Sequence, residues 1–476
     1  MNKTLFYFDK ISKIARPSGH EQNISKFLQD FAKKRNLDFF VDPTYNVIIK
    51  KSTNCNKNKT LILQAHSDMV CEKNANKTID FLSEGIKTFV KDDFMFADGT
   101  TLGADNGIGL SMILSILDDN AIKIPNLECV FTAQEESTMN GAFNLNTNLL
   151  NGRHLLSIDG TDEGKIEVSS AGMTVFEAAK KYTNYQTLDY FKLYKNCGIY
   201  KIELTDFRGG HSGSEIHTNK QNVIKHAGSF LSKIKDKIQF INICAGNKSN
   251  AIPRDFSCIV LAHNLSLSYI KNIANDYLKT IIAIEPFAKF KITKLDFDNI
   301  QKRHATLLSL PESTKIINFI CNYQNGVLNK NQQNFVVSSN NLASINLNNC
   351  SLSIVVSLRS SNKIQNKQYE DTILNYFKSF DLQATITSRA PFFERNTNSY
   401  LQPLCQKTYK ALFNKDAVLE DIHAGLEGGV FSEKIKDIDI CVIAPNIYDA
   451  HSPSERVSLS SIERVYKWLE NIVENF

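Results

Sequence analysis

The sequence predicts an α/β protein whose mostly parallel central sheet is flanked by helices and interrupted by an inserted α+β segment. In the first part of the chain, short apolar strand patterns alternate with helical patterns, which is typical of a parallel sheet. In the middle part, strand and helix pairs are accompanied by extra strand patterns such as "KFKITKL", which indicate antiparallel pairing. We therefore expect one domain formed by residues 1–182 and 396–476, with an inserted domain at residues 183–395.

The elements of the first domain follow from their apolar spacing. "HEQNISKFLQDFAKKRN" has apolar residues at helical intervals, and the breaker Pro17-Ser18-Gly19 precedes it. "NVIIK", "TLILQAH", "LECVFTAQE" and "HLLSID" are short apolar runs typical of strands, and "DNGIGLSMILSILDD" predicts a helix with one apolar face. After the insert, "IDICVIAP" predicts another strand. The last helix is expected from Ser460, since Glu463 stands at the capping-box position.

The insert repeats one pattern of a strand followed by an amphipathic helix. "YKIELTDFRGG" precedes "KQNVIKHAGSFLSKIKDKI", and the same order recurs in "FSCIVLAHNLSLSYIKNIANDYLKTIIAIE" and in "CSLSIVVSLRSSNKIQNKQYEDTILNYFKSF". "LQATITSRAP" adds a strand before the chain returns to the first domain. These segments predict an antiparallel sheet with helices.

Composition excludes several classes of protein. The 476 residues are 42% hydrophobic and 22% charged, which is ordinary for a globular protein with a proper core. The net charge of +5 comes from 55 basic and 50 acidic residues mixed along the chain, so we expect no nucleic-acid partner. No stretch approaches the roughly 18 apolar residues of a membrane span, and the N-terminus lacks the apolar core of a signal peptide. We expect a cytoplasmic protein without a membrane partner.

The cysteines support the same expectation. Ten cysteines are scattered singly, and no Cys-x-x-Cys pair is present, so a thiolate zinc site is not expected. Reduced thiols fit a reducing compartment. They are Cys55, Cys71, Cys129, Cys197, Cys244, Cys258, Cys321, Cys350, Cys405 and Cys441.

Polar side chains follow several of the predicted strands. In "LILQAHSDMV", His66 and Asp68 are two residues apart and therefore share one face of the strand. Ligands of open α/β sheets bind at the carboxyl ends of the strands, so residues delivered there are candidates for a site. These candidates are His66, Asp68, Asp105, Glu135, Glu136, Asp159 and His451.

The donor set favours a metal. Carboxylates crowded at one sheet edge repel one another, and a divalent cation relieves this repulsion. Two histidines with three carboxylates and no cysteine suit zinc, manganese or cobalt. Asp105 could bridge two metals about 3.5 Å apart, the usual spacing of paired sites. Glu135 would then remain beside them as a general base.

Several motifs, taken together and in order, resemble one family. They are "LILQAHSDMVCEKN", "DGTTLGADNGIG", "EESTMNGA", "RGGHSGSEIH", "NAIPR", "HAGLEGG" and "AHSPSERVS". The ordered set covers essentially the whole chain. It resembles the aminoacyl-histidine dipeptidases, also called Xaa-His or cytosolic non-specific dipeptidases, of the dizinc aminoacylase and carboxypeptidase superfamily. The sequence departs from the usual family pattern at Gln134, where an aspartate is common.

The resemblance implies a catalytic domain formed by both ends of the chain and a lid inserted between them. It also implies two zinc ions per chain, with manganese or cobalt as substitutes. His66 and Asp159 would hold one ion, Glu136 and His451 would hold the other, and Asp105 would bridge them.

The resemblance further implies hydrolysis of unblocked dipeptides, either Xaa-His and carnosine-like or of broad specificity. Glu135 would be the general base that activates a bridging, zinc-activated water, and Asp68 would orient His66. The lid would supply the remaining site residues. His211 in "GGHSG" would steady the oxyanion, and the substrate-binding residues would be Asn250, Arg359 and Gly425. Gly425 could equally be an ordinary turn glycine.

Two alternatives stay open. A deacylase or carboxypeptidase could cleave N-acylated amino acids on the same metal site, and recognition of a free amine, for which Glu427 is a candidate, would distinguish it. A non-catalytic peptide-binding protein would predict loss of Glu135 or of a metal ligand, and none is lost. A homodimer is possible, so His211 could act within one chain or across a dimer. We expect structural roles for His217 and His423.

Overall fold

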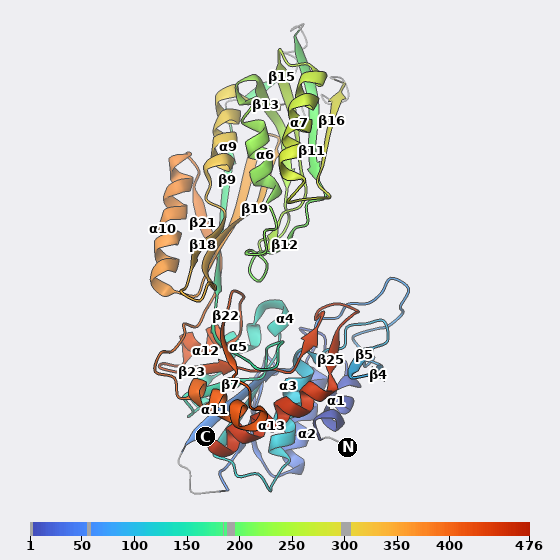
Figure 1. Ribbon diagram of the computed structural model, residues 1–476, viewed down its shortest axis with the longest axis vertical. Helices are drawn as coiled ribbons and strands as arrows, with labels where there is room; N and C mark the ends of the chain where they lie inside the picture. The colour runs from blue at the N-terminus through green and yellow to red at the C-terminus, as the bar shows by residue number, and fades with distance from the viewer. Residues whose placement is uncertain (1–2, 55–58, 184, 188–195, 297–305) are drawn as a thin grey trace. The chain divides into compact units, whose positions relative to one another are not determined.

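The computed structural model describes residues 3–54, 59–183, 185–187, 196–296 and 306–476. It divides the chain into two compact units, drawn in Figure 1. Unit 1 comprises Met1–Ser170, Phe392–Ile422 and Leu426–Phe476, and unit 2 comprises Ala171–Pro391 and His423–Gly425. The divisions predicted from the sequence fall after residues 182 and 395.

Unit 1 is built on an eight-stranded sheet. Its order is β1 (Asp38–Val41), β2 (Val47–Lys51), β6 (Asn126–Thr132), β3 (Thr60–His66), β7 (His154–Ser157), β23 (Asp439–Val442), β8 (Lys165–Ser170) and β22 (Val418–Ile422). The central strand β3 runs parallel to both neighbours, β23 runs parallel to β7, and β22 runs parallel to β8. The β1–β2–β6 side is antiparallel. This arrangement confirms the predicted α/β class.

Helices cover both faces of this sheet, as the alternation of side chains along β3 requires. Leu61, Leu63 and Ala65 lie in the larger core, whereas Ile62 lies in the smaller core on the opposite face. The larger core is completed by α1 (Lys3–Ser12), α2 (Gln22–Lys34), α3 (Ala104–Leu117), α11 (Leu401–Phe413) and α13 (Leu459–Asn475). The smaller core is completed by α5 (Asn140–Asn144) and α12 (Gly428–Lys434).

Two local predictions differ from the structure. The helix α3 was expected to have one apolar face, but it is buried around its whole circumference, because α1, β3 and α13 all pack against it. The last helix was expected from Ser460. It begins instead at Leu459, because the Ser458 side chain accepts a hydrogen bond from the Ser461 amide and is the N-cap.

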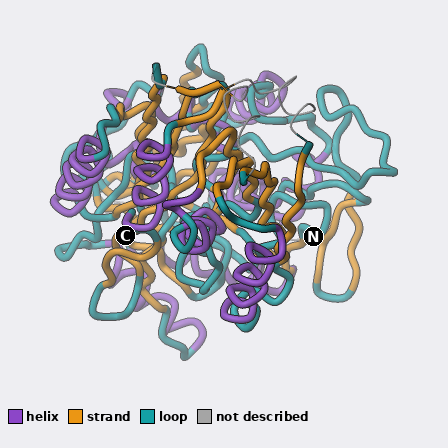
Figure 2. The backbone as a smooth tube through the Cα atoms, turned by 90° about the horizontal axis from the view of Figure 1, so that it is seen from above, coloured by secondary structure: helices purple, strands orange, loops and turns teal. Residues whose placement is uncertain are grey.

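Unit 2 contains a nine-stranded sheet in which every pairing is antiparallel, as predicted. Its order is β16 (Lys289–Leu295), β11 (Cys197–Thr205), β15 (Phe256–His263), β13 (Ile238–Ala245), β19 (Val336–Asn348), β20 (Ser351–Ser360), β9 (Gly172–Lys181) and β21 (Ala384–Ala390), and β18 (Gly326–Lys330) also pairs with β19. The core of this unit combines the sheet with α6 (Val223–Leu231), α7 (Leu267–Ile281), α9 (Leu310–Asn322) and α10 (Lys363–Ser379). Both units contain helices and strands, and Figure 2 colours the backbone by these two kinds of element.

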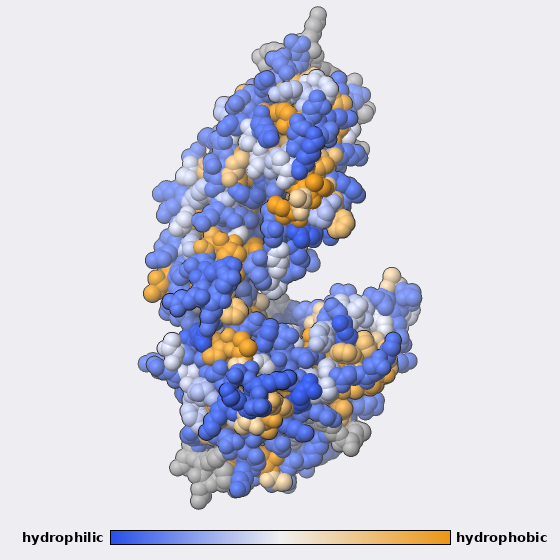
Figure 3. Space-filling model, in the orientation of Figure 1, coloured by the Kyte–Doolittle hydropathy of each residue, from blue (hydrophilic) through white to orange (hydrophobic). Residues whose placement is uncertain are grey.

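The surface seen in Figure 3 is largely polar, and the described cysteines are unpaired. On the face seen in Figure 3, hydrophilic residues predominate and the apolar patches are small and separate. The nine cysteines within the described ranges are free thiols, and Cys55 lies outside those ranges. No helix in the described part of the chain has both the length and the apolar character needed to cross a bilayer.

Candidate metal centre and active site

The carboxylate of Asp105 lies between two histidines in unit 1. His66 is the last residue of β3, and its Nε2 is 3.0 Å from Asp105 Oδ1. His451 follows β24 (Ile447–Tyr448), and its Nε2 is 3.3 Å from Asp105 Oδ2. Each oxygen of one carboxylate therefore faces a different imidazole. These histidines are 385 positions apart in the chain, so tertiary structure brings them together.

Two further carboxylates complete this cluster. Asp159 Oδ1, just after β7, is 3.3 Å from His66 Nε2 and accepts a hydrogen bond of 2.6 Å from Asn106 Nδ2. Glu136 Oε2 is 3.0 Å from His451 Nε2. His66, Asp105 and Glu136 have ligand atoms within 4.8 Å of one another. The structure thus brings together all five residues for which the sequence suggested a metal.

The two glutamates follow the end of β6, as expected, but they lie in a short helix that the sequence did not predict. The strand ends at Thr132, Gln134 takes a left-handed conformation with φ 57°, and Glu135 and Glu136 begin the short helix α4 (Glu135–Thr138). Asp68 anchors this turn, because its Oδ1 and Oδ2 accept the amides of Glu135 and Glu136, each at 3.1 Å. Asp68 Oδ1 is also 3.4 Å from His66 Nδ1. One buried carboxylate thus contacts both sides of the cluster.

Burial and charge shift the proton affinities in this cluster. Burial raises the pKa of Asp159 to about 6, and it raises the pKa of Glu135 well above its usual value. Hydrogen bonds with Asp105 and Glu136 raise the pKa of His451 to about 10. Burial alone would lower the pKa of His66, but Asp159 and the neighbouring carboxylates raise it well above its ordinary value. Burial would raise the pKa of Asp105, but hydrogen bonds with His451 and His66 lower it below its ordinary value. The cluster therefore combines carboxyl groups whose pKa is raised, one whose pKa is lowered, and imidazoles that attract positive charge.

The distances between the donor atoms and their chemical types fit divalent cations. Ligand atoms that lie 2.0–2.1 Å from a tetrahedral zinc are about 3.3 Å apart, which is close to the nitrogen–oxygen separations of 3.0–3.3 Å observed here. Glu136 Oε1 is buried and has no hydrogen-bond partner among the described residues. Imidazole and carboxylate donors without cysteine suit zinc, manganese or cobalt.

Two buried charged residues near this cluster were not singled out from the sequence. Arg16 and Glu455 are each 2% exposed, and both bind the backbone of the segment that leads into Asp105. Glu455 lies within the quoted motif "AHSPSERVS", so its position four residues after His451 was the available signal. Arg16 had no such signal, because it stands in an ordinary N-terminal segment.

The remaining candidates lie in unit 2, where three of them are close together. His211 in β12 (Gly210–His211) pairs with Ala251 in β14 (Ala251–Ile252), so Asn250 lies beside it, and the Asn250 carbonyl accepts the Ser212 amide at 2.8 Å. A Cβ atom at Gly213 would lie 3.0 Å from the His211 ring and 3.1 Å from Arg359 Nε. His211 and Arg359 are therefore neighbours across a glycine that has no space for a side chain.

The segment His423–Gly425 belongs to the same unit. His423 is buried, and its Nε2 is 2.7 Å from Ser339 Oγ, which fits the structural role expected for it. The Ala424 carbonyl accepts the Ala171 amide at 3.0 Å. For Gly425 the structure gives only this placement, and His217 is exposed.

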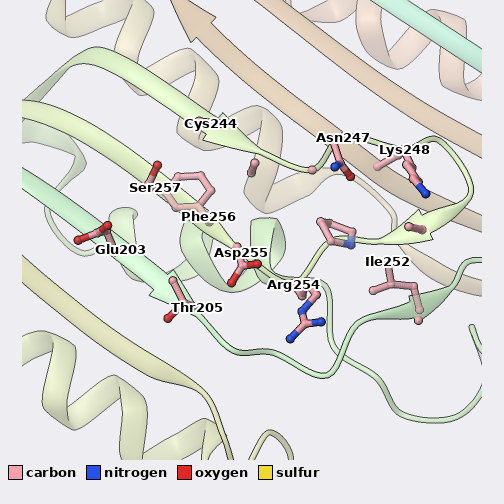
Figure 4. Close-up of a pocket in the computed structure, with 16 residues that line it drawn as sticks. Glu203, Thr205, Cys244, Asn247, Lys248, Ile252, Arg254, Asp255, Phe256 and Ser257 are labelled. Carbon is pink, nitrogen blue, oxygen red and sulfur yellow. The ribbon is translucent and has the colours of Figure 1, made fainter. Parts of the chain in front are cut away.

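A separate pocket of about 700 Å³ lies in unit 2 and is drawn in Figure 4. It is lined by the residues that follow Asn250, from Ala251 to Ser257, and by the end of β13. Its side chains Arg254 and Asp255 are exposed, and none of the eleven candidate site residues lines it. The chemistry suggested by the sequence therefore lies elsewhere.

Known proteins are similar to this chain over almost its full length. The cytosol non-specific dipeptidase of Escherichia coli (strain K12) is 30% identical over 475 residues, which are 98% of this chain and 96% of that protein. The crystal structure of an aminoacylhistidine dipeptidase from Vibrio alginolyticus matches with a TM-score of 0.86 and 26% identity, covering 100% of this chain and 96% of that one. The aminopeptidase PepT from Bacillus cereus shares the fold, with a TM-score of 0.56, 13% identity and coverage of 99% and 97%.

A family profile also matches most of the chain. The profile described as peptidase family M20/M25/M40 matches residues 62–475, which include every candidate ligand in unit 1. The chain therefore belongs to peptidase family M20/M25/M40 and is a metal-dependent peptidase.

Proposed function

We propose that this enzyme hydrolyses unblocked dipeptides in the cytoplasm, with two divalent cations, zinc or its substitutes manganese and cobalt, held by unit 1. His66 and Asp159 would hold one cation, His451 and Glu136 would hold the other, and Asp105 would be shared between them. The observation that carries this proposal is the Asp105 carboxylate, whose two oxygens lie 3.0 Å from His66 Nε2 and 3.3 Å from His451 Nε2. Paired metal sites are commonly bridged in this way.

The side chains beside the cations have complementary roles. When bound, the cations would supply polarisation of the peptide carbonyl and a lowered pKa of a water molecule. Glu135 accepts a proton from the attacking water and passes it to the leaving amine, as expected for a carboxylate next to but outside the ligand set. Asp68 holds the Glu135 amide at 3.1 Å and lies 3.4 Å from His66 Nδ1, so it orients the base and a ligand together.

We assign to unit 2 the role of a lid that binds the substrate. Burial, with a further contribution from Arg359, lowers the pKa of His211 to about 4, so its imidazole is neutral. The Ser214 amide donates to His211 Nδ1 at 3.1 Å, which leaves the ring proton on Nε2. This N–H is suited to donate to the developing oxyanion, within one chain or across a homodimer.

Arg359 is suited to the carboxylate at the end of a dipeptide. Its side chain is 5% exposed, and its Nε has no hydrogen-bond partner within the described structure. Burial lowers its pKa to about 10, so it is still charged at neutral pH. A buried guanidinium without an anion is costly, and a planar carboxylate accepts two of its N–H groups. We assign Asn250 and Gly425 to the same substrate-binding surface.

Glu427 favours a free amine over an acylated one. It is 1% exposed, and its Oε2 accepts hydrogen bonds from Gln64 Nε2 at 2.7 Å and Thr132 Oγ1 at 2.5 Å. Its Oε1 is buried and has no partner in the part of the chain that the structure describes. Burial raises its pKa to about 8. An ammonium group would complete this carboxylate, whereas an N-acyl group would not.

The test begins with metal removal and restoration. The chelated enzyme should be inactive, and zinc, manganese or cobalt should restore hydrolysis of dipeptides at a stoichiometry of about two ions per chain. N-acetylated dipeptides should be poor substrates, and efficient cleavage of them would favour the deacylase alternative. The preference between Xaa-His and other dipeptides is read from the same panel.

Replacement of the general base tests catalysis independently of metal binding. Glu135→Gln should keep its metal but lose at least about 100-fold in kcat, as expected for removal of a general base. The exposed Glu433→Gln is the matched control and should be unchanged. If Glu135→Gln retains substantial turnover, another group is the base. If no dipeptide is cleaved by the wild-type enzyme with any metal, a peptide-binding role is the better account.

A further inference from the structure

The Glu455 carboxylate binds four consecutive backbone amides. Its Oε2 accepts the amides of Leu102 and Gly103 at 2.7 and 2.9 Å, and its Oε1 accepts those of Ala104 and Asp105 at 2.8 and 3.3 Å. The side chain is 2% exposed. These amides lie at the start of α3, where they have no partners within the helix. A side chain about 350 residues later in the chain therefore holds the backbone that presents Asp105.

Arg16 binds the carbonyl groups of the same region. Its Nη2 donates to the Gly103 carbonyl at 2.5 Å, and its Nη1 donates to the carbonyls of Asp68 at 2.6 Å and Ser67 at 3.2 Å. Both backbone groups of Gly103 are thus bound by charged side chains. Gly103 has φ 68°, and a Cβ atom there would lie 2.5 Å from Arg16 Nη2, so only glycine fits.

We propose that Glu455 is a positioning residue that sets the geometry of Asp105 and joins it to the loop of His451. Glu455 is four residues after His451 and accepts the Asp105 amide itself. A displacement of either loop is therefore transmitted to the other. The inference rests on the proposed function, because the proposed function assigns Asp105 and His451 to one metal centre.

The hydrogen-bond pattern requires a carboxylate. All four partners are donors, and an ionised carboxylate offers only acceptors. In Glu455→Gln one oxygen becomes an NH₂ group, which would face amide donors instead of accepting from them. At least one pair of the four amides then loses its acceptor while staying buried. The segment 102–105 must shift, and Asp105 moves with it.

Glu128 offers a closely matched control in the same unit. It is also 2% exposed, and it accepts the backbone amides of Asn151 and Gly152 at 2.9 and 3.0 Å. It lies in β6 and binds a loop that carries none of the candidate ligands. Glu128→Gln removes a similar buried anion without touching the proposed metal centre. The two variants therefore separate loss of stability from loss of ligand position.

The zinc affinity of each full-length, metal-free protein is measured by competition with a chromophoric chelator. The stability of the same samples is measured by denaturant unfolding. Glu455→Gln should bind zinc about 10- to 100-fold more weakly, the usual effect of removing a partner of a ligand. Glu128→Gln should unfold more easily but bind zinc as the wild type does. Glu455→Asp, which keeps the charge but shortens the reach, should bind with intermediate affinity and serves if the glutamine variant does not fold.

The outcomes are distinct. Wild-type zinc affinity in a folded Glu455→Gln protein would overturn the inference, and so would wild-type affinity in Glu455→Asp if only that variant folds. An equal loss in Glu128→Gln would also overturn it, since the effect would then reflect stability alone. Failure of the wild-type protein to bind zinc, manganese or cobalt would instead refute the proposed function.

Discussion

Replacement of Asp68 by asparagine is the most direct test of how the cluster is held. Asp68 is fully buried, and its two oxygens each accept one amide, from Glu135 and from Glu136, at 3.1 Å. It also lies 3.4 Å from His66 Nδ1. An asparagine has almost the same shape but only one acceptor oxygen, so at least one of these groups faces an NH₂ group.

The expected magnitude follows from this count. A hydrogen bond to a charged acceptor contributes about 1.5–3 kcal/mol, and about 1.4 kcal/mol corresponds to a tenfold change. Loss of one such bond therefore predicts a decrease of roughly 10- to 100-fold in kcat/KM or in metal affinity, which agrees with typical effects of removing the partner of a ligand. The value of kcat/KM is measured on the metal-loaded enzyme with an unblocked dipeptide, and metal affinity is measured on the metal-free protein by competition with a chelator.

The control for this variant is Asp118→Asn. Asp118 also accepts two charged or polar donors, Arg35 Nε at 2.6 Å and Tyr7 Oη at 2.8 Å, but it lies at the other end of α3. It should lower stability without changing kcat/KM. If Asp68→Asn keeps kcat/KM and metal affinity within about threefold of the wild type, the proposed orienting role is wrong.

Three further predictions concern unit 2. Arg359→Ala should raise KM strongly for dipeptides but little for dipeptide amides, and equal effects in steady-state kinetics would exclude a carboxylate clamp. Glu285→Gln should destabilise the protein by about 3 kcal/mol at pH 7, because buried Glu285 accepts the Arg208 amide at 2.9 Å and pairs with its guanidinium. Burial would raise the pKa of Glu285, but these hydrogen bonds lower it below its ordinary value. The stability it contributes is therefore present above about pH 4.3 and lost as pH falls through the folded pKa, so the variant should show a smaller acid-induced loss in denaturant titrations. Lys225→Met should cost about 2–3 kcal/mol, since Lys225 Nζ donates to three carbonyls at the end of α9 at 2.6–2.7 Å, whereas the exposed Lys271→Met should cost almost nothing in thermal unfolding.

Local sequence patterns predicted secondary structure correctly where the residues of one segment decide whether it forms a strand or a helix. The apolar run before His66 forms β3, and the antiparallel strands of the insert form the sheet of unit 2. The helix α3 was only partly predicted. Its glycines and apolar residues indicated a helix, but its burial on all sides depends on three elements that pack around it.

The conformation of the turn that carries Glu135 and Glu136 also depends on distant segments and could not be predicted from the local sequence. The sequence placed both residues at a strand end, whereas they open α4 after a left-handed Gln134. That conformation is held by contacts from distant segments, because Glu21 Oε1 accepts the Gln134 amide at 3.1 Å and Asp68 accepts the next two amides. No local pattern near residue 135 specifies these partners.

The sequence by itself determined the α/β class, the antiparallel insert and the kinds of side chain that gather at the strand ends, because periodicity and residue type are properties of short segments. Only the tertiary structure decided that one Asp105 oxygen faces His66 and the other faces His451, and that Glu455 and Arg16 hold the backbone between them. The physical reason is that hydrogen bonds and buried charges join groups separated by hundreds of residues, and their distances are set by how the whole unit packs.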